Sequence, residues 1–541
     1  MRYDQVRCEF LLNNVWVDLN RYRLQAYPIH GSIGIQGTGP LDRVASTGTL
    51  KLTLLNTNNQ FTPGHANCMP GFETGMKFRL RITYSGRTLT RFYGTVPPDG
   101  ISIKSTKFVS TTEVLAVDYM ETLAVHELDL PPLAFDKKIS DIVDLILENI
   151  PVKPLSLDLD TGKSTFGSVF DTTSEKARAL QEIGKVTLAE LGFVYIKSTP
   201  DCDEVLVVEE RQARNGKALS TTQVPELDSI PDRRITQSSD VRITEDTATR
   251  VLQPNFVSEV IEISDDFKDV DFRHAKDYYN RVSAKAYPRR VDANNVVLFT
   301  LERTLRIDAG ATIELRGRYK DPDQLAVSVA AHSNVDPVAA TDYLFNSAED
   351  GSGVNMTASL TVEAVPGANG IDYKLTNTDV TTGYVTFLQA RGKGIYTYRP
   401  VEQIQVNDEM LSREGTRTLS LDMRYQDNIY EISDFAVAML KKYSQKLTVP
   451  ESVEINANRA CTPLLACAFA TLQVGDKIRL VVSSAGYEGE AFIQGMNFEI
   501  AAGDVVTYTL FLKEALYETD QIWILDDAVN SALGLTTVLG Y

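Results

Sequence analysis

The five histidines and five cysteines come first, because imidazoles and thiolates bind metals and act as bases or nucleophiles. No HExxH or GxSxG pattern occurs around them. His65 and Cys68 have a ligand-like spacing, and Cys461 lies near Cys467, but a structural zinc site needs about four ligands. We therefore expect no catalytic residue, no cofactor and no metal. The other residues of these two types are His30, His126, His274, His332, Cys8 and Cys202.

Two adjacent acidic pairs, Glu209-Glu210 and Asp265-Asp266, offer the carboxylates that a glycosidase uses. Neighbouring residues of a strand point to opposite faces, so such a pair cannot flank one glycosidic bond. A solvated or interface role is favoured for both pairs.

Several loops have the composition of ligand-binding turns. Asp321-Pro322-Asp323 and Asp350-Gly351-Ser352-Gly353 could hold calcium, and ordinary turn chemistry explains them equally well. Gly37-Thr38-Gly39-Pro40 and Gly392-Lys393-Gly394 lack the strand–loop–helix context of a phosphate-binding loop. We interpret these glycine-containing segments as turns.

Composition limits the classes of function. At 541 residues we expect about three or four domains. The net charge of −18 argues against a nucleic-acid binder, which needs clustered Lys and Arg, so no sequence-specific nucleic acid is expected. Few, scattered cysteines indicate reduced thiols in a protein that folds in a cytosol. No apolar run reaches the length of about 20 residues that a membrane helix needs, so we expect no stable membrane insertion.

The first 130 residues have the pattern of antiparallel strands. Leu50, Leu52 and Leu54 alternate with polar residues, and the segment 76–83 alternates strictly, as a half-buried strand does. A turn and a second strand at 89–96 complete a hairpin. The fold class expected is mainly β with α+β parts, containing two related β-barrel domains, an α+β domain and an inserted β-sandwich.

Helical patterns interrupt the strands. Ser140 can cap a helix that extends to Asn149, and a longer helix is expected from about Ser174 to Leu191 with Gly192 as its C-cap. The expected divisions are a first β-barrel at 1–130, an α+β domain at 131–235, connecting strands at 236–293, an inserted Ig-like β-sandwich at 294–400, a linker and helix at 401–447, a second β-barrel at 448–518 and a C-terminal tail at 519–541.

An internal repeat connects the two ends of the chain. The hairpin at 75–96 and the segment 475–498 share a glycine turn, an amphipathic strand, a tight turn and a second strand that ends at glycine. Chance similarity between hairpins and duplication of one barrel both explain the match. The positions that define the repeat are Gly75, Arg79, Leu80 and Gly94 in the first copy and Gly475, Arg479, Leu480 and Gly495 in the second.

The order of several loose motifs resembles baseplate or tail-tip hub proteins of long-tailed bacteriophages, of the siphovirus or myovirus-like kind. The resemblance covers roughly residues 1–290 and 400–520; the segment 294–400 departs from it. The motifs that carry it are Ser46–Asn56, Asn59–Pro63, Pro70-Gly71, Phe92-Tyr93-Gly94, Leu191–Tyr195, Glu209-Glu210-Arg211, Tyr278–Val282, Val474–Ile478 and Phe492–Gly495.

The resemblance implies a structural virion protein at the tail tip, without enzymatic activity. It implies a homotrimer whose paired barrels form a pseudo-six-fold ring that caps the tail tube, for DNA and the tape-measure protein to pass. Acidic residues lining such a channel would keep DNA from sticking. The partners implied are a distal-tail or tail-tube hexamer, the tape-measure protein and, as a further class, tail-fibre or receptor-binding proteins.

Two alternatives stay open at this point. The chain could be an adhesin that binds a receptor or surface glycans through the sandwich at 294–400, or a cell-wall hydrolase. Only about 25 residues follow the last barrel, too few for a further catalytic domain. The apolar residues Trp523, Ile524 and Leu525 in this tail could pack on their own barrel or dock on another tail protein.

Overall fold

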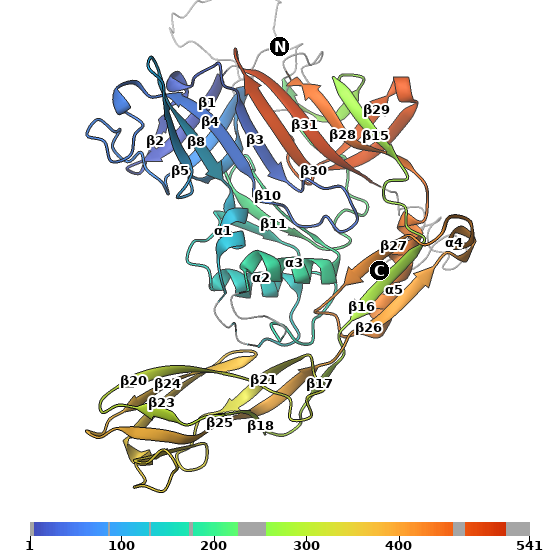
Figure 1. The fold of residues 1–541 in the computed structure, drawn as a ribbon. Helices are drawn as coiled ribbons and strands as arrows, with labels where there is room; N and C mark the ends of the chain where they lie inside the picture. The colour runs from blue at the N-terminus through green and yellow to red at the C-terminus, as the bar shows by residue number, and fades with distance from the viewer. Residues whose placement is uncertain are drawn as a thin grey trace, which may run out of the picture.

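The computed structural model describes residues 5–84, 87–128, 131, 133–171, 177–225, 256–457 and 471–515. Strands dominate, and the helices lie below a large sheet (Figure 1). The predicted fold class, mainly β with α+β parts, is confirmed. Cys461, Cys467 and the C-terminal tail at 519–541 lie outside the described residues.

A first β unit is built from the N-terminal strands. Their inward side chains alternate with outward polar ones, so one face of each strand is buried. The strands are β1 (Gln5–Leu12), β2 (Val15–Asp18), β3 (Ile29–Gly34), β4 (Thr49–Leu55), β5 (Lys77–Tyr84), β6 (Arg87–Thr95), β7 (Ile101–Ser105) and β8 (Ser110–Val117).

A second β unit draws its strands from three separate stretches of the chain. One stretch, with two strands, comes before the insert, and the other two stretches, with four strands, follow it, so this unit forms by long-range pairing. The strands are β14 (Glu262–Ser264), β15 (Asp269–His274), β28 (Thr448–Asn456), β29 (Lys477–Val482), β30 (Tyr487–Ala501) and β31 (Val505–Glu514).

The two β units share one 14-stranded sheet. The strands of the two expected barrels are joined where β3 pairs antiparallel with β30, from Ile29–Ile500 to Gly34–Gly495. Backbone hydrogen bonds therefore fuse the two ends of the chain into one surface.

The α+β unit lies under this sheet (Figure 1). It contains α1 (Tyr119–Val125), α2 (Ile139–Glu148), α3 (Ala179–Glu190) and a sheet of β9 (Ser156–Leu159), β11 (Val205–Glu209) and β10 (Phe193–Lys197). The helix predicted at 140–149 begins at Ile139, after Lys138. The C-cap of α3 is Leu191, which adopts the left-handed conformation (φ 59°). The sequence had predicted Gly192 as this cap. Gly192 instead donates its N–H to Thr187.

The segments expected as connecting strands and as a linker come together in a small α+β unit. β16 (Arg281–Ala286) lies between β26 (Val401–Val406) and β27 (Thr418–Asp422), and α5 (Ile429–Tyr443) packs on this sheet. α4 (Asp408–Glu414) connects two of its strands, while β12 (Thr221–Pro225) and β13 (Phe256–Val260) form a separate hairpin pair.

The insert has its own hydrophobic core, separate from the core that runs through the rest of the body. Its long strand β25 (Gly383–Thr397) pairs with five others, and a three-stranded sheet lies against them. The remaining strands are β17 (Arg289–Val291), β18 (Val296–Thr300), β19 (Leu305–Ile307), β20 (Thr312–Arg318), β21 (Ser328–Val335), β22 (Tyr343–Asn346), β23 (Leu360–Pro366) and β24 (Gly370–Asn377).

Candidate functional site: a polar wall across two β units

The outward face of the shared sheet forms a continuous polar surface that we call the polar wall. It arises from strand alternation: at the β3–β30 junction Gly31 and Phe498 face the core, whereas His30 and Glu499 face outward. The same alternation continues across β4, β8, β31 and β28. The polar wall consists of His30, Ser32, Thr49, Lys51, Glu113, Glu454, Asn497, Glu499, Thr507 and Thr509.

Carboxylates outnumber cations on the polar wall, because Glu113, Glu454 and Glu499 accompany a single lysine, Lys51. Lys51 lies 3.0 Å from Glu113, and Lys268 lies 2.6 Å from Glu454 at the edge of the wall. Burial opposes ionisation of Glu113, but Lys51 and Lys104 outweigh it and lower the pKa of this carboxyl. The wall therefore combines hydroxyl and amide groups with a small excess of carboxylates, two of which lie beside lysines.

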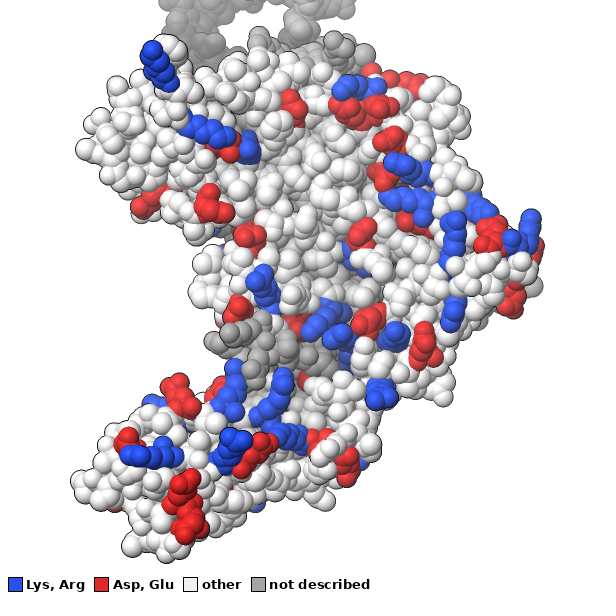
Figure 2. Space-filling view, in the orientation of Figure 1, with Lys and Arg blue, Asp and Glu red and all other residues white. Residues whose placement is uncertain are grey.

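A shallow hollow of about 460 Å³ lies on the wall over the junction of the two β units. Charged side chains are sparse over the upper sheet and denser lower on the molecule (Figure 2). Hydroxyl and amide groups bind a phosphate backbone only weakly, because phosphates are bound mainly by Lys and Arg.

Glycines make the close approach at the junction possible. A Cβ on Gly495 would lie 2.5 Å from the carbonyl oxygen of Ile35, and one on Gly31 would lie 2.0 Å from the ring of Phe498. Gly34 has a φ of 82° and pairs with Gly495 across the junction. The backbone packing across the junction therefore requires residues without a side chain.

The two predicted repeat hairpins each begin with a glycine that has a positive φ. Gly75 and Gly475 have φ values of 85° and 87°. Gly75 donates its N–H to Val96 at 2.7 Å, and Gly475 donates to Ile493 at 2.8 Å. Leu80 and Leu480 are fully buried, one in each hairpin.

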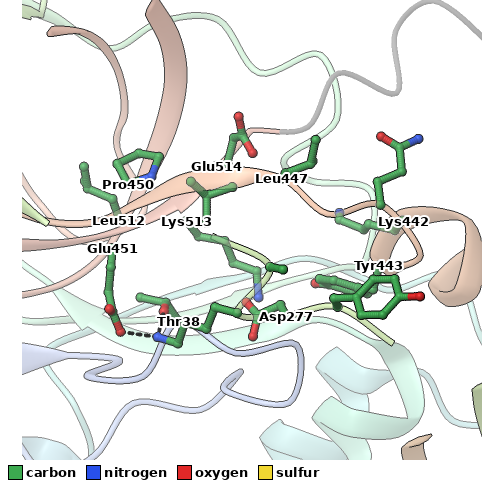
Figure 3. A pocket seen from close by; sticks show the side chains of 15 residues that line it. Thr38, Asp277, Lys442, Tyr443, Leu447, Pro450, Glu451, Leu512, Lys513 and Glu514 are labelled. Atoms are coloured by element: carbon green, nitrogen blue, oxygen red, sulfur yellow. Dashed lines mark hydrogen bonds and ion pairs between the residues drawn. The ribbon is translucent and has the colours of Figure 1, made fainter. Parts of the chain in front are cut away.

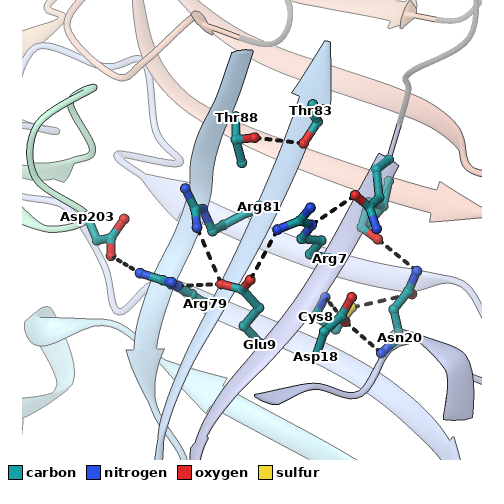
Figure 4. A network of polar contacts seen from close by, with 12 residues as sticks. Arg7, Cys8, Glu9, Asp18, Asn20, Arg79, Arg81, Thr83, Thr88 and Asp203 are labelled. Carbon is teal, nitrogen blue, oxygen red and sulfur yellow. Dashed lines mark hydrogen bonds and ion pairs between the residues drawn. The ribbon is translucent and has the colours of Figure 1, made fainter. Parts of the chain in front are cut away.

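The other repeat positions differ in surroundings. Arg79 pairs with Glu9 at 2.6 Å and with Asp203 at 2.9 Å, a network that ties the hairpin to the α+β unit (Figure 4). Arg479 is more exposed and pairs with Glu262 and Glu488.

The two closing glycines lie in different places. Gly94 faces Phe78 inside its own hairpin. Gly495 lies beyond its hairpin and faces Gly34 across the junction. The structure therefore brings Gly495, but not Gly94, to the seam between the two β units.

Two side chains reinforce the junction from the first unit. Arg23 forms an ion pair with Asp504 at 2.6 Å. Arg91 is almost wholly buried, donates to the carbonyl of Leu472 and lies 5.2 Å from the ring of Tyr508. Neither residue could be predicted from the sequence, because nothing in a sequence indicates that distant segments are neighbours.

A small cavity of about 60 Å³ lies where the second unit meets helix α5 (Figure 3). Lys513 extends toward Asp277 in this cavity and donates to the carbonyl of Gly39 at 2.8 Å. Burial, aided by Arg43 and Lys442, lowers the pKa of Lys513 well below its usual value. A lysine of this kind can be a nucleophile, but the cavity has room for about two waters only.

Two buried carboxyls, Asp118 and Glu204, lie between the first β unit and the α+β unit. Burial raises the pKa of each to about 7. Asp118 accepts a hydrogen bond from the N–H of Met120 and so caps α1, which gives it a structural task.

The candidate metal and calcium residues serve local structure. His65 accepts from the N–H of Asn67, and Cys68 contacts the carbonyl of Phe72. Asp321 accepts three backbone N–H groups at 2.9 Å, which is turn chemistry. Within the described ranges no three His, Cys, Asp or Glu side chains are grouped as metal ligands.

Comparisons with known proteins were made with the sequence and with the fold. No family model and no curated protein matches the chain. A 43 kDa tail protein of prophage MuSo2 from Shewanella oneidensis is similar in structure, with a TM-score of 0.46, 9% identity, and coverage of 94% of this chain and 98% of that one.

Two further structures are similar. A tail protein from Neisseria meningitidis has a TM-score of 0.44 and 8% identity, covering 95% of this chain and 97% of that one. An E. coli type VI secretion component, described as similar to T4 bacteriophage tail proteins, has a TM-score of 0.36 and 8% identity, covering 91% and 75%.

None of the helices that the structure describes is both long and apolar enough to cross a membrane.

Proposed function

We propose that this chain is a structural, non-enzymatic subunit of a phage-type tail tip, and that three copies form a hub ring around a central channel. The observation that carries the proposal is the shared sheet, in which two β units of like strand order present one polar wall. Three chains would then supply six like units around one axis, which matches a trimer to a six-fold tube.

The channel face in this proposal is the polar wall. Its hydroxyl groups and its excess of carboxylates over lysines favour passage of DNA over retention. The ring would cap the tail-tube or distal-tail hexamer and let DNA and the tape-measure protein pass. Tail-fibre or receptor-binding proteins are a further partner class, and the chain would fold in the host cytoplasm before it joins the virion.

The test is the mass of the full chain in solution at micromolar concentration. Native mass spectrometry should give three times 60.0 kDa, that is 180 kDa. A stable monomer over this concentration range would contradict the proposal.

A second candidate role belongs to the insert, as a module that binds a receptor or glycan. The observation in its favour is its separate core, which lets its surface vary without disturbing the body. The full chain and a variant without the insert should be compared for binding to host cell-wall material. Equal retention of both would leave the insert a spacer.

A further inference from the structure

Two strand edges at the ends of the polar wall have no backbone partner strand in the described part of the chain. Across the wall the strands run β15, β28, β31, β30, β3, β4, β8 and β7. The outermost strand β7 pairs with β8 alone, and β15 pairs with β28 alone. Free edges of this kind are templates for pairing with another chain.

The repeat hairpins give a common frame for comparing the two units. Val96 and Ile493 occupy equivalent positions, because the carbonyl oxygen of each accepts a hydrogen bond from the N–H of the turn glycine, Gly75 or Gly475. Each also donates back to the residue after that glycine. Val96 and Ile493 are therefore equivalent.

Beyond these anchors, β7 lies against β8 as the second half of β30 lies against β31. Ile101 pairs with Val114, which lies two positions before the residue of β8 that faces Val96. Met496 pairs with Leu510, which lies two positions before the residue of β31 that faces Ile493. The pairs Ile101–Val114 and Met496–Leu510 are therefore equivalent. Counting on from Ile101, the residue Lys104 is the counterpart of Glu499.

On the other side, β15 relates to β28 as β3 relates to β4. Leu52 and Val453 face the equivalent positions of β8 and β31. The residue before Leu52 pairs with His30, and the residue before Val453 pairs with Asp271. His30 and Asp271 are therefore counterparts.

The free strand β7 is thus the counterpart of the second half of β30, and the free strand β15 is the counterpart of β3. Inside the chain, β30 and β3 pair with each other. We infer that β7 of one copy pairs antiparallel with β15 of the next copy, with Lys104 opposite Asp271 of the neighbouring copy. This inference rests on the proposed hub and names the contact that closes it. The register follows from the internal junction, where Glu499 faces His30.

The apolar side of the junction supports this partner. In the same register Ile103 would face Phe272 of the neighbouring copy, an aliphatic–aromatic pair that stabilises sheets. Ile103 is 42% exposed, whereas its counterpart Phe498 is 3% exposed under β3. Pairing with a second copy would bury Ile103 as the internal junction buries Phe498.

The charges on the polar side select the partner. Lys104, whose side chain is 69% exposed and lies 3.6 Å from Glu113, would also face the carboxylate of Asp271. Opposite charges directly across a strand pair stabilise it, so this register is favoured between copies.

Charge reversal tests the contact in the full chain. Lys104→Asp or Asp271→Lys alone should raise the concentration at which half of the trimer dissociates by about tenfold or more. Combining both changes should restore the wild-type value, which damage to folding could not do. Lys320→Asp is the matched control, because Lys320 is similarly exposed (63%) on the insert, and it should change nothing.

A cysteine pair tests the register. Directly opposite strand residues have Cβ atoms about 4.5–5.5 Å apart, within reach of a disulfide after small shifts. The double variant Lys104→Cys, Asp271→Cys should give covalent trimers on a non-reducing gel, and each single variant should give none. Wild-type trimers that tolerate both reversals and form no crosslink would overturn the inference and leave the hub proposal standing. A wild-type monomer would overturn both.

Discussion

The body and the insert are both built from strands, but they are held together in different ways. In the body, strands from opposite ends of the chain share one sheet, and a single core runs through both β units and the α+β unit. The insert is one continuous stretch with its own core. Because of this difference, we expect the body to unfold as one unit and the insert to unfold separately from it.

One of the contacts between the two regions is a buried ion pair. Arg289 at the root of the insert donates to Asp171 of the α+β unit, at 2.5 and 3.1 Å, and both side chains are almost wholly buried. Thr397, at the other root, donates to the same carboxylate at 2.9 Å. Asp171 therefore binds both strands that enter and leave the insert.

The largest predicted effect comes from this clamp. Asp171→Asn leaves the guanidinium of Arg289 buried without a counter-charge, and should lower the free energy of unfolding by about 3–5 kcal/mol. Urea titration followed by circular dichroism measures it. Asp308→Asn removes an exposed ion pair with Arg306 and should leave the midpoint nearly unchanged. Equal effects of the two variants would show that the clamp does not couple the regions.

The next effect concerns the junction in the body. In Gly495→Ala the new Cβ would meet the backbone of Ile35, and neither strand can yield without breaking the pairing, so a loss of about 2–3 kcal/mol is expected. Gly184→Ala is the control: Gly184 lies inside α3 with open space around it, and the change should stabilise by up to about 1 kcal/mol. Thermal unfolding of both variants decides it. A harmless Gly495→Ala would mean that the strands are not packed at this seam.

A smaller effect should appear as a pH dependence. The pKa of Asp118 and of Glu204 is raised to about 7 by burial, so the folded state keeps protons that the unfolded state has lost. The resulting stability is complete below about pH 4 and is lost as the pH rises through about 7.

Asp118→Asn keeps the cap of α1 and should remove part of this slope, on the order of 1–2 kcal/mol between about pH 5 and 8. Asp99→Asn, at an exposed position of the same β unit, is the control and should keep the wild-type slope. The unfolding midpoint across that pH range is the measurement. Parallel slopes for all three proteins would refute the prediction.

The smallest effect on the body should come from removing most of the insert. Arg289 and Thr397 face each other across the ladder, so a short Asn-Gly turn can replace residues 290–396 while the clamp to Asp171 is kept. Calorimetry should show one transition fewer and a body transition changed by about 1 kcal/mol or less. A body that no longer folds would contradict the separation of the two cores.

Local patterns predicted a good part of this fold. The hairpin at 75–96 and the strictly alternating strand at 76–83 are visible in the sequence because their partners are near in the chain. The insert was predicted at 294–400 from its change in composition, and the structure has its strands between Arg289 and Thr397.

The junction could not be predicted in the same way. β3 and β30 are joined by backbone hydrogen bonds between opposite ends of the chain, and backbone groups carry no sequence signal. The strand partners of β15 and β16 could not be predicted for the same reason, since those partners lie beyond the insert. One clue was present: Ile29, Gly31 and Ile33 alternate with polar residues as a half-buried strand does.

The most direct test of the central claim is an electron cryo-microscopy map of the purified full chain at intermediate resolution. The proposed hub should show three chains around one axis, six like β units, and a hollow centre lined by the polar wall with His30 and Glu499 facing it. A ring of a different copy number, or one with the polar wall on its outer surface, would contradict the proposed hub.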